Sequence, residues 1–279
     1  MKIITSTQEI QKVTSKLREK NKSIGFIPTM GALHEGHLQL VRESKTKNDV
    51  TIVSIFVNPT QFSPTEDLTK YPRPIEQDKK LLRREKVDIL FYPSTKEIYP
   101  TDFQTTVTVN QLSRILEGKS RPTHFAGVST IVLKLFNLIS PTNTYFGQKD
   151  FQQCIVIKQM IRDLNLPIIF NMVPTVREPD GLALSSRNIF LNSQERLQAV
   201  NLYQSLLFGK KLILLGNKNV QKIKSEMDNY LQKYKLIRLD YIEICDSENL
   251  SPLKVVSKKA VILISANVGK TRLIDNIII

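Results

Sequence analysis

The sequence predicts an α/β protein with a parallel sheet over residues 1–177, followed by a smaller α+β domain over residues 178–279. In the first part, short β-rich runs alternate with amphipathic stretches, which is typical of parallel strands connected by helices. In the second part, two long helical stretches precede three β-rich runs, which is the order of an α+β domain. A chain of 279 residues has room for one large or two ordinary domains, and the change of pattern favours two.

The predicted strands of the first part are short runs of apolar and β-branched residues. They cover residues 24–28, 50–57, 88–92, 144–146 and 168–173. Helices are expected to begin in the capping region Thr5-Ser6-Thr7 and at Asp150, because such side chains accept hydrogen bonds from unpaired helix amides. Residues 124–138 are apolar on several sides, so we expect a helix that is buried against the sheet.

The second part is predicted to hold helices over residues 193–215 and 220–234, and then strands over 239–244, 260–266 and 272–279. Residues 178–188 connect the two domains and contain the sequence Ser-Ser-Arg. A connection of this kind is well placed to move over a bound ligand.

Composition and charge restrict the possible partners and location. No apolar run is long enough to cross a bilayer, and residues 1–5 lack the apolar stretch of a signal peptide, so we expect a cytoplasmic protein without a membrane partner. Cys154 and Cys245 are flanked by apolar residues, which indicates buried, reduced thiols. The net charge of +14 raises nucleic acid as a partner. The lysines are scattered, however, and no aromatic residues alternate with them, so we expect no nucleic-acid role.

Two of the three histidines lie three residues apart in the segment Pro-Thr-Met-Gly-Ala-Leu-His-Glu-Gly-His, residues 28–37. The segment follows a short apolar run and precedes a stretch with helical spacing, so it predicts a strand, a turn and a helix N-terminus. Such a junction offers free backbone N–H groups and a positive helix dipole to an anion, and the two histidines add donors, which favours phosphate. Zinc is not favoured, because the zincin pattern places its histidines four residues apart, and a Walker sequence is absent.

Further segments carry polar groups in positions suited to nucleotide and acid binding. Residues 147–150, Gly-Gln-Lys-Asp, end a strand and offer backbone donors, an ammonium and a carboxylate, although an ordinary turn with Asp150 as a helix cap has the same pattern. Ser185, Ser186 and Arg187 supply two hydroxyls and a guanidinium that suit triphosphate oxygens, or else form a surface loop. In open parallel sheets ligands bind beyond the carboxyl ends of strands. Pro28, Asn58 and Gly147 each follow a predicted strand, so we expect them to line one crevice.

The segment 34–37 resembles the His-x-Gly-His element of the nucleotidyltransferase superfamily, and with its flanking residues it resembles the pantothenate synthetase family in particular. The resemblance continues in residues 56–62, 71–73, 124–128, 146–150 and 180–188, in the order that the family shows. Where the wider superfamily often has a Lys-Met-Ser-Lys-Ser loop, this chain has Leu184 before the serines and lacks the first lysine.

The resemblance implies a Rossmann-like N-terminal domain and an ATP-dependent condensation of (R)-pantoate with β-alanine through a pantoyl adenylate, with release of pyrophosphate and AMP. It implies Mg²⁺ with the ATP, no assigned metal ligands in the protein, and a homodimer. It implies catalytic roles for His34, His37, Lys149 and Arg187, pantoate binding by Gln61 and Gln153, and a position near β-alanine for Gln61. It further implies contacts with ATP for Met30, Gly31, Ala32, Leu33, His34, Glu35, Gly36, His37, Gly147, Gln148, Lys149, Asp150, Val176, Leu184, Ser185, Ser186 and Arg187.

Three points remain open at this stage. A transferase of the same superfamily that makes a dinucleotide cofactor would share the His-x-Gly-His element, although it would not require the sequence Asn-Pro-Thr-Gln-Phe at 58–62. His124 is either a third phosphate donor or a residue packed near the sheet. Asp78 lies on a predicted helix, where the resemblance places acidic residues near the metal region.

Overall fold

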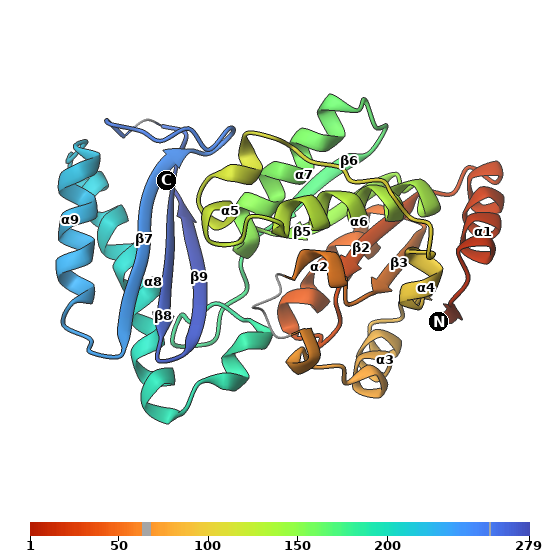
Figure 1. Cartoon of the computed structure of the whole chain (residues 1–279), viewed down its shortest axis with the longest axis horizontal. Helices are drawn as coiled ribbons and strands as arrows, with labels where there is room; N and C mark the ends of the chain where they lie inside the picture. The colour runs from red at the N-terminus through yellow and green to blue at the C-terminus, as the bar shows by residue number, and fades with distance from the viewer. Residues whose placement is uncertain (63–67, 257) are drawn as a thin grey trace. The chain divides into compact units, whose positions relative to one another are not determined.

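The computed structural model describes residues 1–62, 68–256 and 258–279, and they form two compact units. The first unit comprises Met1–Gly147 and Val156–Val173, and the second comprises Gln148–Ile155 and Pro174–Ile279 (Figure 1). The second unit therefore begins a few residues before 178 and also takes in the segment after Gly147.

The first unit is built on a parallel sheet whose described strands run in the order β1-β4-β3-β2-β5-β6. The strands are β1 Lys2–Ile4, β2 Ile24–Thr29, β3 Val50–Ile55, β4 Ile89–Phe91, β5 Asn143–Gly147 and β6 Ile169–Val173. The five strands that the sequence predicts are confirmed to within a few residues. The three-residue strand β1 was not predicted, and it pairs with β4.

Helices connect these strands, as the alternating pattern predicts. They are α1 Thr7–Glu19, α2 Glu35–Lys47, α3 Ile75–Arg84, α4 Thr95–Ile98, α5 Glu117–Ser120, α6 His124–Ile139 and α7 Phe151–Asp163. Short 3-10 turns lie at η1 Pro59–Gln61, η2 Leu68–Lys70, η3 Leu112–Arg114, η4 Gln148–Asp150 and η5 Ser186–Phe190. The predicted buried helix is confirmed as α6, and Ser6 caps α1.

Alternate residues of each strand face opposite sides of the sheet, and this places helices on both faces. Phe26 of β2 meets Phe136 of α6 edge to face, with ring centroids 6.4 Å apart. Its neighbour Ile27 belongs to a core cluster with Val41 of α2 and Leu82 of α3. In open parallel sheets of this kind, ligands bind beyond the carboxyl ends of the strands.

The second unit contains an antiparallel sheet in the order β7-β8-β9, covered by two helices. Its elements are α8 Ser193–Leu214, α9 Val220–Leu231, β7 Ile237–Asp246, β8 Ala260–Val268 and β9 Thr271–Ile278, drawn from green to blue in Figure 1. Leu202 and Leu206 of α8 and Met227 of α9 pack on Ile244 and Ile262 of the strands in one buried cluster. The predicted α+β character of this part is confirmed.

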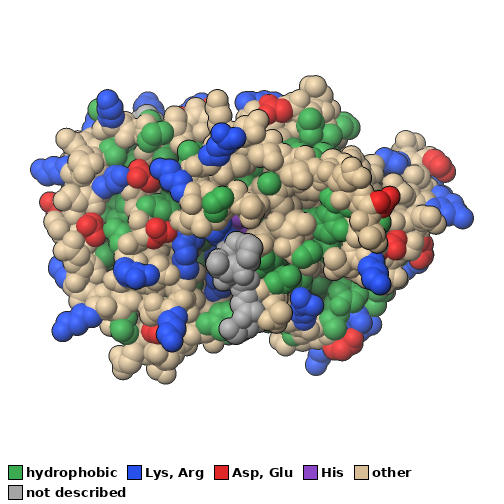
Figure 2. Space-filling view, viewed as in Figure 1, with side chains coloured by type: hydrophobic (Ala, Val, Ile, Leu, Met, Phe, Trp, Pro, Cys, Tyr) green, Lys and Arg blue, Asp and Glu red, His purple; other side chains and the backbone are tan. Residues whose placement is uncertain are grey.

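Among the described residues, none of the helices combines the length and the apolar composition that a membrane crossing requires. Both cysteines, Cys154 and Cys245, are buried and free, as predicted. On the face shown in Figure 2, Lys and Arg side chains lie among acidic and apolar ones.

Candidate active site

The turn after β2 contains two successive residues with positive φ, and one buried carboxylate binds its backbone. Gly31 has φ +82°, and a Cβ on it would lie 3.0 Å from Oδ2 of Asp78, so glycine is required. The next residue, Ala32, has φ 50°, which is costly for a residue with a side chain. Oδ2 of Asp78 accepts a hydrogen bond from the Ala32 amide at 2.9 Å, and Oδ1 accepts one from the Leu33 amide at 2.8 Å.

Asp78 is a buried carboxylate that supports this turn. Its residue exposure is 1%, and burial raises its pKa, while the two backbone hydrogen bonds act in the opposite direction. The amides of Ala32 and Leu33 are therefore engaged within the protein. The expectation that the turn offers free backbone donors is wrong for these two amides, because it did not foresee a carboxylate that binds them.

His34 and His37 form a reciprocal cap at the start of α2. Nδ1 of His34 accepts from the Gly36 amide at 3.2 Å, and Nδ1 of His37 accepts from the His34 amide at 3.3 Å. The ring centroids are 4.2 Å apart. Because Nδ1 accepts in both rings, the neutral imidazoles carry their hydrogen on Nε2, which is thus the donor nitrogen of each ring.

The loop after β3 is joined to this turn by side-chain hydrogen bonds. Nε2 of Gln61 donates to Sδ of Met30 at 2.9 Å, and Oε1 of Gln61 accepts from Nδ2 of Asn58 at 3.1 Å. Nδ2 of Asn58 also donates to the carbonyl of Gly127, and its Oδ1 accepts from the Tyr99 hydroxyl at 2.9 Å. Asn58 and Gln61 are 1% and 7% exposed, so their amides are held in place inside the protein.

His124 binds the backbone of the same loop. The Gln61 carbonyl accepts from Nδ1 of His124 at 2.9 Å, and therefore Nε2 of His124 accepts from Nη1 of Arg121 at 3.2 Å. His124 therefore holds the Gln61 loop, a role that neither of the two alternatives left open by the sequence described. Asn58 and Arg121 belong to this network and were not among the predicted site residues.

The carboxyl ends of β2, β3 and β4 open onto a hollow of about 190 Å³ in the first unit. Met30, Gly31 and Asp78 line it together with Arg73 and residues 55–57. Sheet topology placed a site at this edge, and the hollow lies there. Predicted residues Met30, Gly31, His34, His37 and Gln61 are thus gathered in the first unit by the contacts described above.

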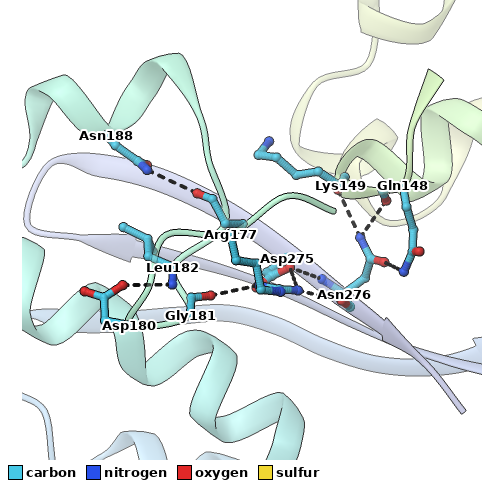
Figure 3. A network of polar contacts seen from close by, with 10 residues as sticks. Gln148, Lys149, Arg177, Asp180, Gly181, Leu182, Asn188, Asp275 and Asn276 are labelled. Carbon is cyan, nitrogen blue, oxygen red and sulfur yellow. Dashed lines mark hydrogen bonds and ion pairs between the residues drawn. The ribbon is translucent and has the colours of Figure 1, made fainter. Parts of the chain in front are cut away.

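In the second unit, the segment that contains Lys149 is bound to strand β9. Asn276 donates through Nδ2 to the carbonyls of Gln148 at 2.9 Å and Lys149 at 3.0 Å, and its Oδ1 accepts from Nε2 of Gln148 at 3.1 Å (Figure 3). Nζ of Lys149 lies 3.3 Å from Oδ1 of Asp150. The helix that was predicted to begin at Asp150 starts one residue later, at Phe151, after the 3-10 turn η4.

The segment with the two serines is attached to the same strand through Arg177. Nη1 and Nη2 of Arg177 donate to the Asp275 carboxylate at 2.6 and 2.9 Å, and the guanidinium lies 3.6 Å from the ring centroid of Tyr203. Leu184 donates its amide to the carbonyl of Val176, which closes a hairpin. Directly after it, Ser185 caps η5 by accepting from the Arg187 amide at 3.2 Å.

Lys149, Ser185 and Arg187 line one small hollow of about 20 Å³ in the second unit. Arg272 lines it as well and is paired with Asp240 at 2.6 Å. The predicted cations and a predicted serine are thus brought together. Arg177, Arg272, Asp275 and Asn276 were missed, although polar residues at 272, 275 and 276 interrupt an otherwise apolar strand sequence, and this was a signal that could have found them.

The other predicted residues have simple placements. Glu35 is exposed and pairs with Arg42, and Gly147 ends β5 opposite Val173. Gln153 is half-buried in the first turn of α7, and Ser186 begins η5.

Comparison with known proteins identifies the family of this fold and these sites. A family model described as pantoate-beta-alanine ligase matches residues 2–278. Relatives named pantothenate synthetase include the protein of Thermotoga petrophila, 52% identical with 100% of both chains covered, and that of Thermosipho africanus, 53% identical with the same coverage.

Solved structures agree over the whole chain. The pantothenate synthetase of Thermus thermophilus has a TM-score of 0.94 at 40% identity, with 99% of each chain covered. The pantoate-beta-alanine ligase of Francisella tularensis, complexed with "Beta-gamma ATP" and β-alanine, has a TM-score of 0.81 at 38% identity, with 100% of this chain and 97% of that chain covered. With a family model that spans residues 2–278 and relatives more than half identical along their whole length, the chain belongs to the pantoate–β-alanine ligase family.

Proposed function

We propose that the protein condenses (R)-pantoate with β-alanine at the expense of ATP, through a pantoyl adenylate, and releases AMP and pyrophosphate. Family membership over the whole chain supports this reaction. The Francisella tularensis relative, complexed with an ATP species and β-alanine, supports ATP and β-alanine as substrates. A transferase that forms a dinucleotide cofactor is not favoured, because the match is to the ligase family.

One contact carries the proposal from the geometry: the hydrogen bond from Nε2 of Gln61 to Sδ of Met30. It joins a buried amide, which can hold a hydroxy acid without adding charge, to the turn that leads into His34 and His37. A carboxylate held by Gln61 is thereby kept close to the donors that would bind a triphosphate. Gln153 is proposed as a second amide for pantoate.

In the first half-reaction the pantoate carboxylate attacks the α-phosphorus of ATP, and the bond to pyrophosphate breaks. The protein aligns the reactants and stabilises charge that grows on the phosphate oxygens. We assign this role to Nε2–H of His34 and His37, the Lys149 ammonium and the Arg187 guanidinium. The remaining ATP contacts are assigned as the resemblance implies, to residues 30–37, 147–150, 176 and 184–187.

In the second half-reaction the β-alanine amine attacks the acyl carbon, and AMP leaves. Water must be kept from the adenylate in the interval. We assign this protection to the segment 178–188, which follows the Arg177 anchor on strand β9 and carries the two serines and Arg187.

Mg²⁺ is proposed as the companion of the ATP phosphates. In the parts of the chain that the structure describes, no three His, Cys, Asp or Glu residues form a group that could hold a metal. Mg²⁺ commonly keeps several waters and binds mainly through substrate phosphates, and this is the mode proposed here. A homodimer in the cytoplasm, without a nucleic-acid or membrane partner, completes the proposal.

The proposal is tested by product analysis with each substrate omitted in turn. Purified protein with ATP, Mg²⁺, pantoate and β-alanine should form pantothenate, AMP and pyrophosphate in equal amounts. Omission of β-alanine should abolish pantothenate. Consumption of ATP with a nucleotide monophosphate acceptor, and none with pantoate, would overturn the assignment.

A further inference from the structure

Two neighbouring residues of β9, Asp275 and Asn276, each bind a different segment of the candidate site in the second unit. Asp275 is 5% exposed and Asn276 is 1% exposed. Neither residue lies in a segment to which the family resemblance assigns a role. Figure 3 shows both side chains between the Lys149 segment and the hairpin that leads to Asn188.

The side-chain amide of Asn276 both donates hydrogen bonds to, and accepts one from, the segment that contains Lys149. Nδ2 donates to two successive carbonyls, those of Gln148 and Lys149, and Oδ1 accepts from the Gln148 side chain. Two carbonyls need a donor and the Gln148 amide needs an acceptor. A carboxylate at 276 could not donate, and an alanine would leave three half-buried polar groups of Gln148 and Lys149 without this partner.

Asp275 acts on the other segment through Arg177. The bidentate pair is largely buried, with the side chains 16% and 5% exposed, and such forked pairs fix orientation as well as distance. Arg177 also donates to the Gly181 carbonyl at 3.1 Å, so the hairpin that ends at Ser185 is bound near its turn. The backbone amide of Asn276 donates to Oδ1 of Asp275 at 2.8 Å, and this hydrogen bond connects the two anchors.

Each of the two anchored segments contributes one positively charged side chain to the lining of the same hollow. Lys149 and Arg187 line it together with Asp275 itself and Arg272. The hollow is therefore formed by one strand and by two segments that the strand holds. A shift of either segment along β9 would change the spacing between the Lys149 ammonium and the Arg187 guanidinium.

We propose that Asp275 and Asn276 are positioning residues that set the spacing of Lys149 and Arg187 for the ATP phosphates, by fixing both segments to adjacent positions of β9. The proposal rests on the proposed function for the identity of the nucleotide. It assigns to strand β9 a role in substrate binding: Asp275 lines the hollow, and Asn276 acts through the Lys149 segment.

The test compares the Asn276→Ala and Asn276→Ser variants of the full chain with an Asn201→Ala control. Asn201 is a half-buried amide of the same unit that donates to the Gln198 carbonyl at 3.1 Å and accepts from the Tyr230 hydroxyl at 3.0 Å, away from the Lys149 segment. Affinity for a non-hydrolysable ATP analogue is measured by calorimetry, KM for each substrate by steady-state kinetics, and folding by thermal melting.

We expect Asn276→Ala to weaken analogue binding roughly tenfold, since misplaced groups lose much of their effect, and to raise KM for ATP but not for β-alanine. Asn276→Ser keeps one donor and should be intermediate, and Asn201→Ala should bind like the parent. Because Asn276 acts through Lys149, the Lys149→Ala and Asn276→Ala double variant should bind the analogue no more weakly than Lys149→Ala alone.

Folded Asn276 variants that bind the analogue normally would overturn the proposal, as would losses that multiply in the double variant. Failure of both Asn276 variants to fold, with Asn201→Ala folded, would overturn it too, because Asn276 would then serve the fold and not the spacing. A parent protein that binds the analogue but makes no pantothenate would refute the proposed function, while the binding comparison would still decide on Asn276.

Discussion

His34 and His37 are part of the helix cap and, by our proposal, of the phosphate site, so their substitution affects both stability and catalysis. Each Nδ1 accepts a backbone hydrogen bond, and this places the hydrogen of the neutral ring on Nε2. The two functions can be separated, because an asparagine at an N-cap position accepts from the same backbone amides as the histidine does but has no Nε2 donor.

We predict that His34→Asn keeps the stability of the parent and loses adenylate formation, whereas His34→Ala loses both. The loss of one donor to a developing charge is about 2–4 kcal/mol of transition-state stabilisation, and loss of the cap costs about 1 kcal/mol of folding free energy. His37→Ala should also reduce adenylate formation, by the same loss of about 2–4 kcal/mol of transition-state stabilisation. Single-turnover kinetics and urea unfolding measure the two quantities. Full activity in folded His34→Asn would remove His34 from the chemistry.

The raised pKa of Asp78 leads us to expect that its contribution to the free energy of unfolding declines as pH rises. Burial raises its pKa in the folded protein above the value of about 3.9 expected in the unfolded chain. The folded state therefore binds the proton more tightly, so the contribution of this group to stability is greatest below the unfolded pKa and declines as pH rises through the folded pKa.

We predict that the free energy of unfolding of the parent, minus that of Asp78→Asn, becomes smaller as pH rises from about 4 to the folded pKa. Subtraction cancels the other titrating groups, which the two proteins share. Denaturant unfolding at a series of pH values measures the difference. A difference that grows with pH would mean that the two amide hydrogen bonds outweigh burial and lower the pKa of Asp78.

At the scale of elements, helix α6 holds the Gln61 loop by direct contact. A Cβ on Gly127 would lie 2.4 Å from the Thr60 carbonyl oxygen and 2.6 Å from the Gln61 amide nitrogen, which is closer than real Cβ atoms come. Gly209 in α8 is a matched comparison, because a Cβ there would first meet the flexible end of Met227 at 2.5 Å.

We predict that Gly127→Ala raises KM for pantoate at least tenfold and destabilises the protein by about 1–3 kcal/mol, since the loop must move. Gly209→Ala should alter stability without changing KM for pantoate. Steady-state kinetics with varied pantoate, together with thermal melting, distinguish the two variants. An unchanged KM in Gly127→Ala would show that the position of the Gln61 loop does not control pantoate binding.

The elements themselves were largely predictable, because local periodicity determines them. The strands β2 to β9 and the helix α6 followed from short β-rich runs and from an apolar stretch. Strand β1 did not, since three residues have too little pattern of their own and are ordered by pairing with β4, far along the chain. The helix caps at Ser6 and His34 are local features too.

The supporting contacts of the site could not be predicted in the same way. Asp78 binds amides 45 and 46 residues away, Arg177 pairs with Asp275 over 98 residues, and Asn276 binds Gln148 over 128 residues. No local pattern encodes such distances. The sequence therefore indicated the residues proposed to meet substrate, and the structure was needed to show which partners the supporting residues bind.

At the scale of the whole molecule, the proposed reaction requires that the adenylate forms before the β-alanine amine attacks. The His34 and His37 turn is joined to the Gln61 amide within the first unit, so a carboxylate held by Gln61 would lie beside two of the donors assigned to the phosphates. The proposed order therefore places adenylate formation before the attack of the amine. A carboxylate can then attack the α-phosphorus reversibly in the absence of β-alanine.

The most direct test of this account is exchange of labelled pyrophosphate into ATP by the purified protein. We predict exchange with pantoate and Mg²⁺ and without β-alanine, and its loss when pantoate or the divalent cation is omitted. Addition of β-alanine should then convert the adenylate to pantothenate and AMP. Exchange that depends on a nucleotide acceptor in place of pantoate, or exchange that appears only when β-alanine is present, would contradict the account.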